Sequence, residues 1–195
     1  MKLTAIIYPD AGTDWLVAEC GLATEQITRG LSMQWSCPVL STKGFEPEAM
    51  SLALPKVFVT EFGVLPLRVA GHRILYLAFE DRLDASVALA LEQMTELKVE
   101  SGLMDGSQFR EARAALLQCR AVESNLEGVT STASLAARIA AILEQKQPIA
   151  ARLVHLHQYY WLRTWLESGA ISGHGNLPRT SEDVYDHIFT IGARV

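Results

Sequence analysis

Histidines and carboxylates in the last third of the chain are the first residues whose types could support chemistry. His155 and His157 stand two positions apart. On the helix predicted here, their side chains diverge by about 200°, so they cannot hold one metal ion together. The residues that could join one of them are His174, His187, Asp183 and Asp186. Because the i, i+4 histidine pair of zinc-binding helices is missing, we predict partly exposed histidines and no metal site.

Other patterns that would support catalysis are incomplete. Ser172 lies in Gly169-Ala170-Ile171-Ser172-Gly173-His174, which fails the GxSxG motif of serine hydrolases and reads as a turn. The sequence has no GxxxxGK[ST] motif, and therefore no loop of that kind to bind the phosphates of a nucleotide. The three cysteines (Cys20, Cys37 and Cys119) are too few and too scattered for a disulfide framework or a CxxC metal site. We predict no catalytic residue and no cofactor.

An acidic cluster and an aromatic cluster each allow two interpretations. Glu80, Asp81 and Asp84 could bind a cation, but a solvated turn with Asp84 capping the next helix is favoured. A second group, Tyr160, Trp161 and Trp165, lies in a segment predicted to be helical, where the two tryptophans would share a face. These aromatic residues either pack onto the rest of the protein or form a surface for a protein partner, including a second copy in a homodimer.

Composition narrows the class of protein. The chain has 195 residues, 49% of them apolar, and 17 basic against 22 acidic side chains give a net charge of −5. Such a chain folds around a core, and its acidic balance argues against binding nucleic acid or an anionic membrane surface. No apolar run is long enough to cross a membrane, and the first residues do not complete a signal peptide. With the few cysteines, this predicts a reducing, cytoplasmic setting.

The middle of the chain gives the clearest structural pattern. Residues 64–68 and 73–79 read as two strands joined by the turn 69–72, and residues 99–103 read as a third strand. Helices are expected after Asp84 and after Asp105 or Ser107. The order β-β-α-β-α predicts an α+β fold, a small β-sheet packed by helices.

The two ends of the chain are predicted to extend this core. A short strand over residues 1–9 is followed by a helix ending at Gly21 and by a helix that Thr24 could cap. After Gly128, an Ala-rich helix and a second helix over residues 148–160 form a helical hairpin, and a last short helix starts near Ser181. The predicted domains are a helical front piece (1–45), an α+β domain (46–125) and a helical extension (126–195).

The α+β segment resembles a known family. Residues 54–67 read Leu-Pro-Lys-Val-Phe-Val-Thr-Glu-Phe-Gly-Val-Leu-Pro-Leu, and residues 71–78 read Gly-His-Arg-Ile-Leu-Tyr-Leu-Ala. With the acidic turn 81–84, the Lys-Val-Glu of 98–100 and the upstream Leu16-Val17, Gly21-Leu22 and Gln26-Ile27, they resemble the N-terminal domain of type II secretion and type IV pilus assembly ATPases. The resemblance covers roughly residues 15–118.

The resemblance implies a function in protein transport. In that family the domain docks onto components of the secretion or pilus machine, so it implies a non-catalytic interaction or regulatory module with protein partners. Some of these domains bind cyclic di-GMP through an Arg-Leu-Gly triplet, where this chain has Ala11-Gly12-Thr13. Because that arginine is missing, a cyclic dinucleotide sensor with a degenerate motif is the alternative and not the preferred prediction.

Overall fold

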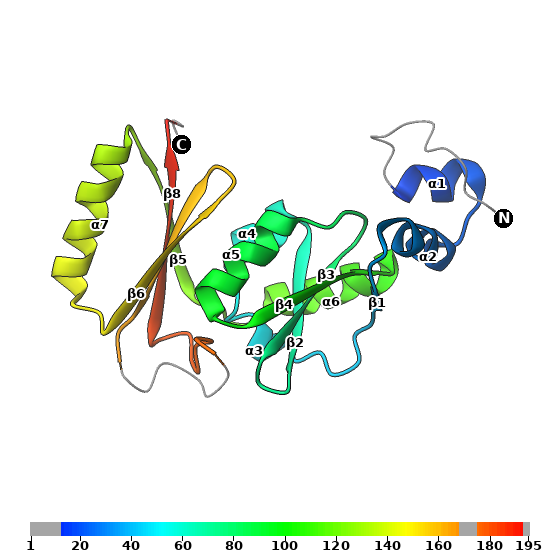
Figure 1. Cartoon of the computed structure of the whole chain (residues 1–195), viewed down its shortest axis with the longest axis horizontal. Helices are drawn as coiled ribbons and strands as arrows, with labels where there is room; N and C mark the ends of the chain where they lie inside the picture. The colour runs from blue at the N-terminus through cyan, green and yellow to red at the C-terminus, as the bar shows by residue number, and fades with distance from the viewer. Residues whose placement is uncertain (1–12, 168–174, 193–195) are drawn as a thin grey trace.

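The structure is a computed structural model that describes residues 13–167 and 175–192, and it contains two small β-sheets packed by helices (Figure 1). The α+β class predicted from the sequence is confirmed. The strand predicted over residues 1–9 lies outside the described residues. The chain begins with helices α1 (Thr13–Cys20) and α2 (Thr24–Trp35), which Gly21 separates in the left-handed conformation. Ala23, and not Thr24, occupies the cap position of α2.

The first sheet has the predicted β-β-α-β-α core. Its strands lie in the order β1-β4-β3-β2, and parallel β3 and β4 are connected through α5. The elements are β1 (Val39–Leu40), α3 (Pro47–Met50), α4 (Lys56–Glu61), β2 (Val64–Ala70), β3 (Ile74–Phe79), α5 (Ala85–Thr95), β4 (Lys98–Met104) and α6 (Gly106–Gln118). Asp84 and Asp105 accept hydrogen bonds from the first amides of α5 and α6, as expected of helix caps.

The last third of the chain is a second sheet, so the prediction of a helical extension is wrong. Strands lie in the order β5-β8-β7-β6. The elements are β5 (Glu123–Val129), α7 (Thr132–Lys146), β6 (Ala150–Leu156), β7 (Tyr159–Trp165) and β8 (Val184–Ile191). Only α7 matches a predicted helix, and Ser131 caps it. The expected helix over residues 148–160 is instead most of the β6–β7 hairpin, and the last short helix is β8.

The two sheets share one hydrophobic core. One face of the second sheet packs against α4 and α5, and Val154, Trp161 and Ile188 from that face join the same cluster as Phe58 and Leu91. The opposite face is covered by α7, which lies on the far side of the sheet from the first unit (Figure 1). This layered packing explains why the second sheet buries apolar side chains on both faces. In the part of the chain that the structure describes, no helix is long and apolar enough to span a membrane.

Candidate functional site

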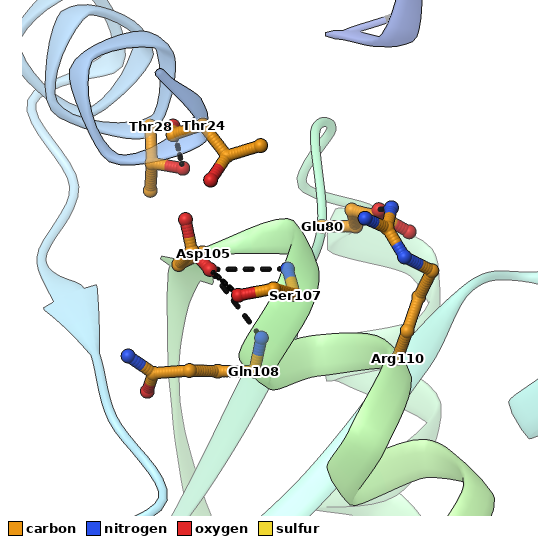
Figure 2. A network of polar contacts seen from close by, with 7 residues as sticks. All are labelled: Thr24, Thr28, Glu80, Asp105, Ser107, Gln108 and Arg110. Atoms are coloured by element: carbon orange, nitrogen blue, oxygen red, sulfur yellow. Dashed lines mark hydrogen bonds and ion pairs between the residues drawn. The ribbon is translucent and has the colours of Figure 1, made fainter.

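A polar junction lies where β4 ends and α6 begins, beside the first turn of α2 (Figure 2). Its centre is Asp105, which is 7% exposed. Oδ1 of Asp105 accepts hydrogen bonds from the amide of Ser107 at 3.0 Å, the hydroxyl of Ser107 at 2.5 Å and the amide of Gln108 at 3.3 Å. Its buried Oδ2 accepts no hydrogen bond of ordinary geometry from the described residues and faces Thr24 and Thr28 of α2 (Figure 2). One carboxylate therefore lies between two helices.

The surroundings of Asp105 favour its charged form. Burial raises the pKa of this carboxyl. Hydrogen bonding by the hydroxyls of Ser107 and Thr24 and by the amides of Gln108 and Ser107 lowers the pKa, and together these effects outweigh burial. The pKa of Asp105 therefore lies below the ordinary value of 3.8. The carboxylate caps the N-terminus of α6, where the helix dipole favours a negative charge. The junction therefore anchors α2 to the end of the first sheet.

An ion pair lies on the other side of the α6 N-terminus (Figure 2). Nη1 of Arg110 lies 2.5 Å from Oε1 of Glu80, which follows β3. Gly106 leaves room for this pair, since a Cβ atom at that position would stand 2.9 Å from Oε1 of Glu80. The site thus offers hydrogen bonding and charge pairing between elements, and its chemistry is that of a structural junction.

The acidic cluster follows the favoured interpretation at Asp84. Its Oδ1 caps α5 through the amides of Ser86 and Val87. Its Oδ2 lies 2.7 Å from Nε2 of His157 in the β6–β7 turn. Burial raises the pKa of Asp84, while the hydrogen bonds from His157 and the two amides and the charge interaction with His157 bring it below 3.8. Asp84 therefore ties the second sheet to the first.

The histidines do not converge on a site. His155 is exposed on β6 with its ring 4.6 Å from that of Tyr160, and His157 pairs with Asp84. His187 is buried on β8, while His174 and Ser172 lie outside the described residues. Within residues 13–167 and 175–192 the structure holds no group of three His, Cys, Asp or Glu side chains placed to bind a metal ion.

The aromatic cluster lies on a strand and not on a helix. Trp161 and Trp165 still share a face, because residues four apart on a strand point the same way, and that face is buried. They are 0% and 1% exposed, and the ring of Trp161 lies 5.6 Å from that of Phe58 in α4. Tyr160 points to the opposite face and is half-buried against the α7 side. Of the two interpretations that the sequence allowed, the two tryptophans follow the first: they pack onto the first unit and form no exposed docking surface.

A buried ion pair lies beside these tryptophans. Nε and Nη2 of Arg163 donate to Oδ1 and Oδ2 of Asp186 at 2.8 and 2.7 Å, and both side chains are fully buried. Trp161 Nε1 donates to Oδ1 of the same carboxylate at 2.7 Å. Sequence reasoning considered Asp186 only as a possible metal ligand and missed Arg163. The signal was available in Trp161-Leu162-Arg163-Thr164-Trp165, where a strand's alternation places the arginine between two large aromatic residues on one face.

His187 is buried without a hydrogen-bond partner among the described residues, and we expect it to make the stability of the protein sensitive to acid. The side chain is 6% exposed, and neither ring nitrogen has a hydrogen-bond partner among the described residues. Burial, with the charges of Lys146 and Arg138, holds the pKa of His187 below 6.5. The folded protein thus resists a proton that the unfolded chain accepts, so stability should fall as the pH drops from 6.5 toward the folded pKa.

We expect His187→Phe to remove this part of the acid sensitivity. The substitution should also leave stability at pH 7.5 unchanged or raised, since it removes two unsatisfied buried nitrogens at similar shape. Urea unfolding midpoints at pH 7.5 and pH 5.5 measure both effects. An unchanged difference between the two pH values in His187→Phe would contradict the assignment.

Two solved structures are similar to about half of this chain. A structure described as MshE with cdg is 23% identical, covers 52% of this chain and 73% of that one, and has a TM-score of 0.41. The N-terminal domain of XpsE is 17% identical, covers 55% of this chain and 76% of that one, and has a TM-score of 0.41. Both are N-terminal domains of type IV pilus or type II secretion ATPases, the group that the sequence resembles. This likeness concerns fold alone. No family model and no curated protein match the sequence.

Proposed function

We propose that this chain is a non-catalytic docking and regulatory module whose α1–α2 arm, residues 13–40 including β1, contacts a protein partner. The observation that carries the proposal is the exposure of large apolar side chains on this arm. Met33 is 78% exposed, Val39 49%, Val17 38% and Trp35 37%. Exposed apolar groups gathered on one segment are typical of protein interaction surfaces.

The attachment of the arm supports the same proposal. Helix α2 packs on the first sheet through Ile27 and Thr28, which are 2% and 4% exposed, and Asp105 lies against its first turn. Helix α1 rests on α2. A partner that binds the arm would therefore act on the end of β4 and the start of α6, through one anchored helix. This arrangement suits a module that passes a binding event to the rest of the fold.

The partner that we propose is a protein component of a secretion or pilus machine. The sequence resemblance over residues 15–118 supports this class. The acidic net charge of −5 supports a protein partner over a nucleic acid. The free thiols of Cys20, Cys37 and Cys119 support a reducing, cytoplasmic location.

Site-specific photocrosslinking tests the proposal. A photoreactive phenylalanine analogue replaces Met33 on the arm or, as a matched control, Leu126 on β5, which is 42% exposed. In the native host we expect a covalent product at position 33 that mass spectrometry identifies as a secretion or pilus component, and none at position 126. Identical product patterns at the two positions would refute a docking role for the arm.

A cyclic dinucleotide sensor is the second candidate function. It is favoured by the helix–turn–helix of α1 and α2 around Gly21, at the place where the sequence resemblance puts the nucleotide-binding motif. Thermal unfolding with and without cyclic di-GMP separates the two candidates. Ligand at 100 times its dissociation constant would add about 2.7 kcal/mol of stability. We expect no shift, and a clear upward shift would replace the docking module by the sensor.

A further inference from the structure

Three of the four sheet edges carry features that discourage pairing with another chain. The β2 edge contains Pro66 and an irregular register beside it. At the β1 edge the strand has only two residues, so it pairs with only the end of β4. Farther along β4, the amide of Val99 donates to Oε1 of Glu92 at 2.8 Å. The β5 edge carries Glu123 and Glu127. Proline, irregular register, very short strands and charges are the usual protections of an edge strand.

The fourth edge, β6, lacks these protections. All seven residues of Ala150–Leu156 pair with β7 in continuous register, and the strand contains no proline. Its one formally charged side chain, Arg152, is engaged with the first unit, where Nη1 donates to the Gln93 carbonyl at 2.6 Å and Nη2 pairs with Glu96. Leu153 remains 47% exposed. The edge is therefore long, regular and apolar.

The hairpin geometry defines which backbone groups of β6 are open. Strands β6 and β7 are joined by a two-residue turn, with Leu156 opposite Tyr159. In a two-residue hairpin this closing pair is hydrogen-bonded, and along an antiparallel strand every second residue bonds to the neighbouring strand. The residues between them, Ala151, Leu153 and His155, therefore direct their N–H and C=O groups away from β7. Their side chains form a stripe on one face, and all three residues are exposed.

We propose that a second copy of this chain pairs with β6, antiparallel across a two-fold axis at Leu153. In this register Leu153 faces the partner subunit's Leu153, and Ala151 faces the partner subunit's His155. The stripe contains no Asp, Glu, Lys or Arg side chain, so pairing two copies of it brings no such charges together even though each copy carries −5 overall. Two four-stranded sheets would thus join into one continuous sheet.

The contact is small, which sets its expected strength. A single strand pair with few flanking side chains lies at the low end of interface sizes, so we expect a dissociation constant on the order of 10 µM. The proposal does not depend on the docking function of the arm, because β6 lies in the second sheet. Changes at β6 should therefore leave crosslinking at Met33 intact.

Sedimentation equilibrium of the whole chain up to roughly 200 µM, well above this dissociation constant, tests the dimer. Wild type should approach twice the monomer mass of 21.5 kDa as concentration rises. Leu153→Lys should remain at 21.5 kDa, because it places two like charges opposite each other. Leu126→Lys, the same change at an exposed leucine of β5, should behave as wild type. Ala151→Pro is a second variant, which blocks the outer edge of β6 while removing an N–H that points away from β7 in the register of the hairpin.

Oxidative crosslinking of Leu153→Cys tests the register. Residues paired across the two-fold axis would have Cα atoms about 5.5 Å apart, within the range for a disulfide. We expect a covalent dimer from Leu153→Cys and none from Leu126→Cys or wild type, which controls for the three native thiols. A wild type that stays monomeric at every concentration overturns the proposal. A dimer that survives both Leu153→Lys and Ala151→Pro, or a Leu153→Cys that forms no covalent dimer, overturns the β6 assignment.

Discussion

Asp186→Ala is expected to lower the free energy of unfolding by about 3–5 kcal/mol, because it leaves the Arg163 guanidinium buried without its partner. Both side chains are 0% exposed, and Trp161 Nε1 also loses its acceptor. Such a loss is a large share of the 5–15 kcal/mol by which a domain is usually stable. Urea unfolding, followed by circular dichroism, measures the change.

Two controls separate the buried pair from ordinary surface charge effects. Glu182→Ala breaks the surface ion pair between Glu182 and Arg120, whose side chains are 69% and 75% exposed respectively. This change should lower the free energy of unfolding by less than about 1 kcal/mol. The double variant Arg163→Met/Asp186→Leu removes both charges and should recover much of the stability lost in Asp186→Ala. A loss in Asp186→Ala no larger than that of Glu182→Ala would show that water reaches the arginine.

Trp161→Ala is expected to cost about 3–5 kcal/mol, and the protein should still unfold in one transition. The indole is fully buried and lies 5.6 Å from the ring of Phe58, so it stands where the two units meet in one core. A cavity there weakens the packing of both sheets together. Fluorescence and circular dichroism should therefore report the same midpoint.

The double-mutant cycle with Phe58→Ala measures how strongly the two units are coupled. We expect a coupling energy of about 0.5–1.5 kcal/mol or more between the two rings. Trp35→Ala, at a tryptophan of the α1–α2 arm that is 37% exposed, should change stability by less than about 1 kcal/mol. Two separate unfolding transitions in the wild type would mean that the sheets are independent domains, and the shared core would then contribute little.

The helix caps and turns of the first unit could be predicted because they depend on neighbouring residues. Asp84 and Asp105 each bind amides two and three positions along the chain, so both helix starts were visible in the sequence. The turn before β3 has Gly71 and His72 at positive φ, and its glycine marked it. The α+β class and the family resemblance followed from these local signals together with the apolar strands.

The second sheet could not be predicted in the same way, because long-range pairing decides it. Leu153, Leu156 and Tyr160 follow the spacing of a helix and not the alternation of a strand, and the β6–β7 turn has no glycine or asparagine to mark it. There His157 takes a φ of +51°, held by its pairing with Asp84, which lies 73 positions away in the sequence. Strand β7 also pairs with β8, which begins at Val184, and its two faces are buried by the first unit and by α7.

The sequence by itself determined the local elements of the first unit, the acidic balance and the absence of common nucleotide and hydrolase motifs. Only the tertiary structure decided what the polar residues do. Asp105 lies between two helices, and Asp186 meets Arg163 across neighbouring strands. The position of β6 at the end of the described sheet likewise follows from the pairing of β5, β8 and β7 and not from its own residues. These features depend on residues that are distant in the chain, and the local sequence carries no record of which distant partners will meet.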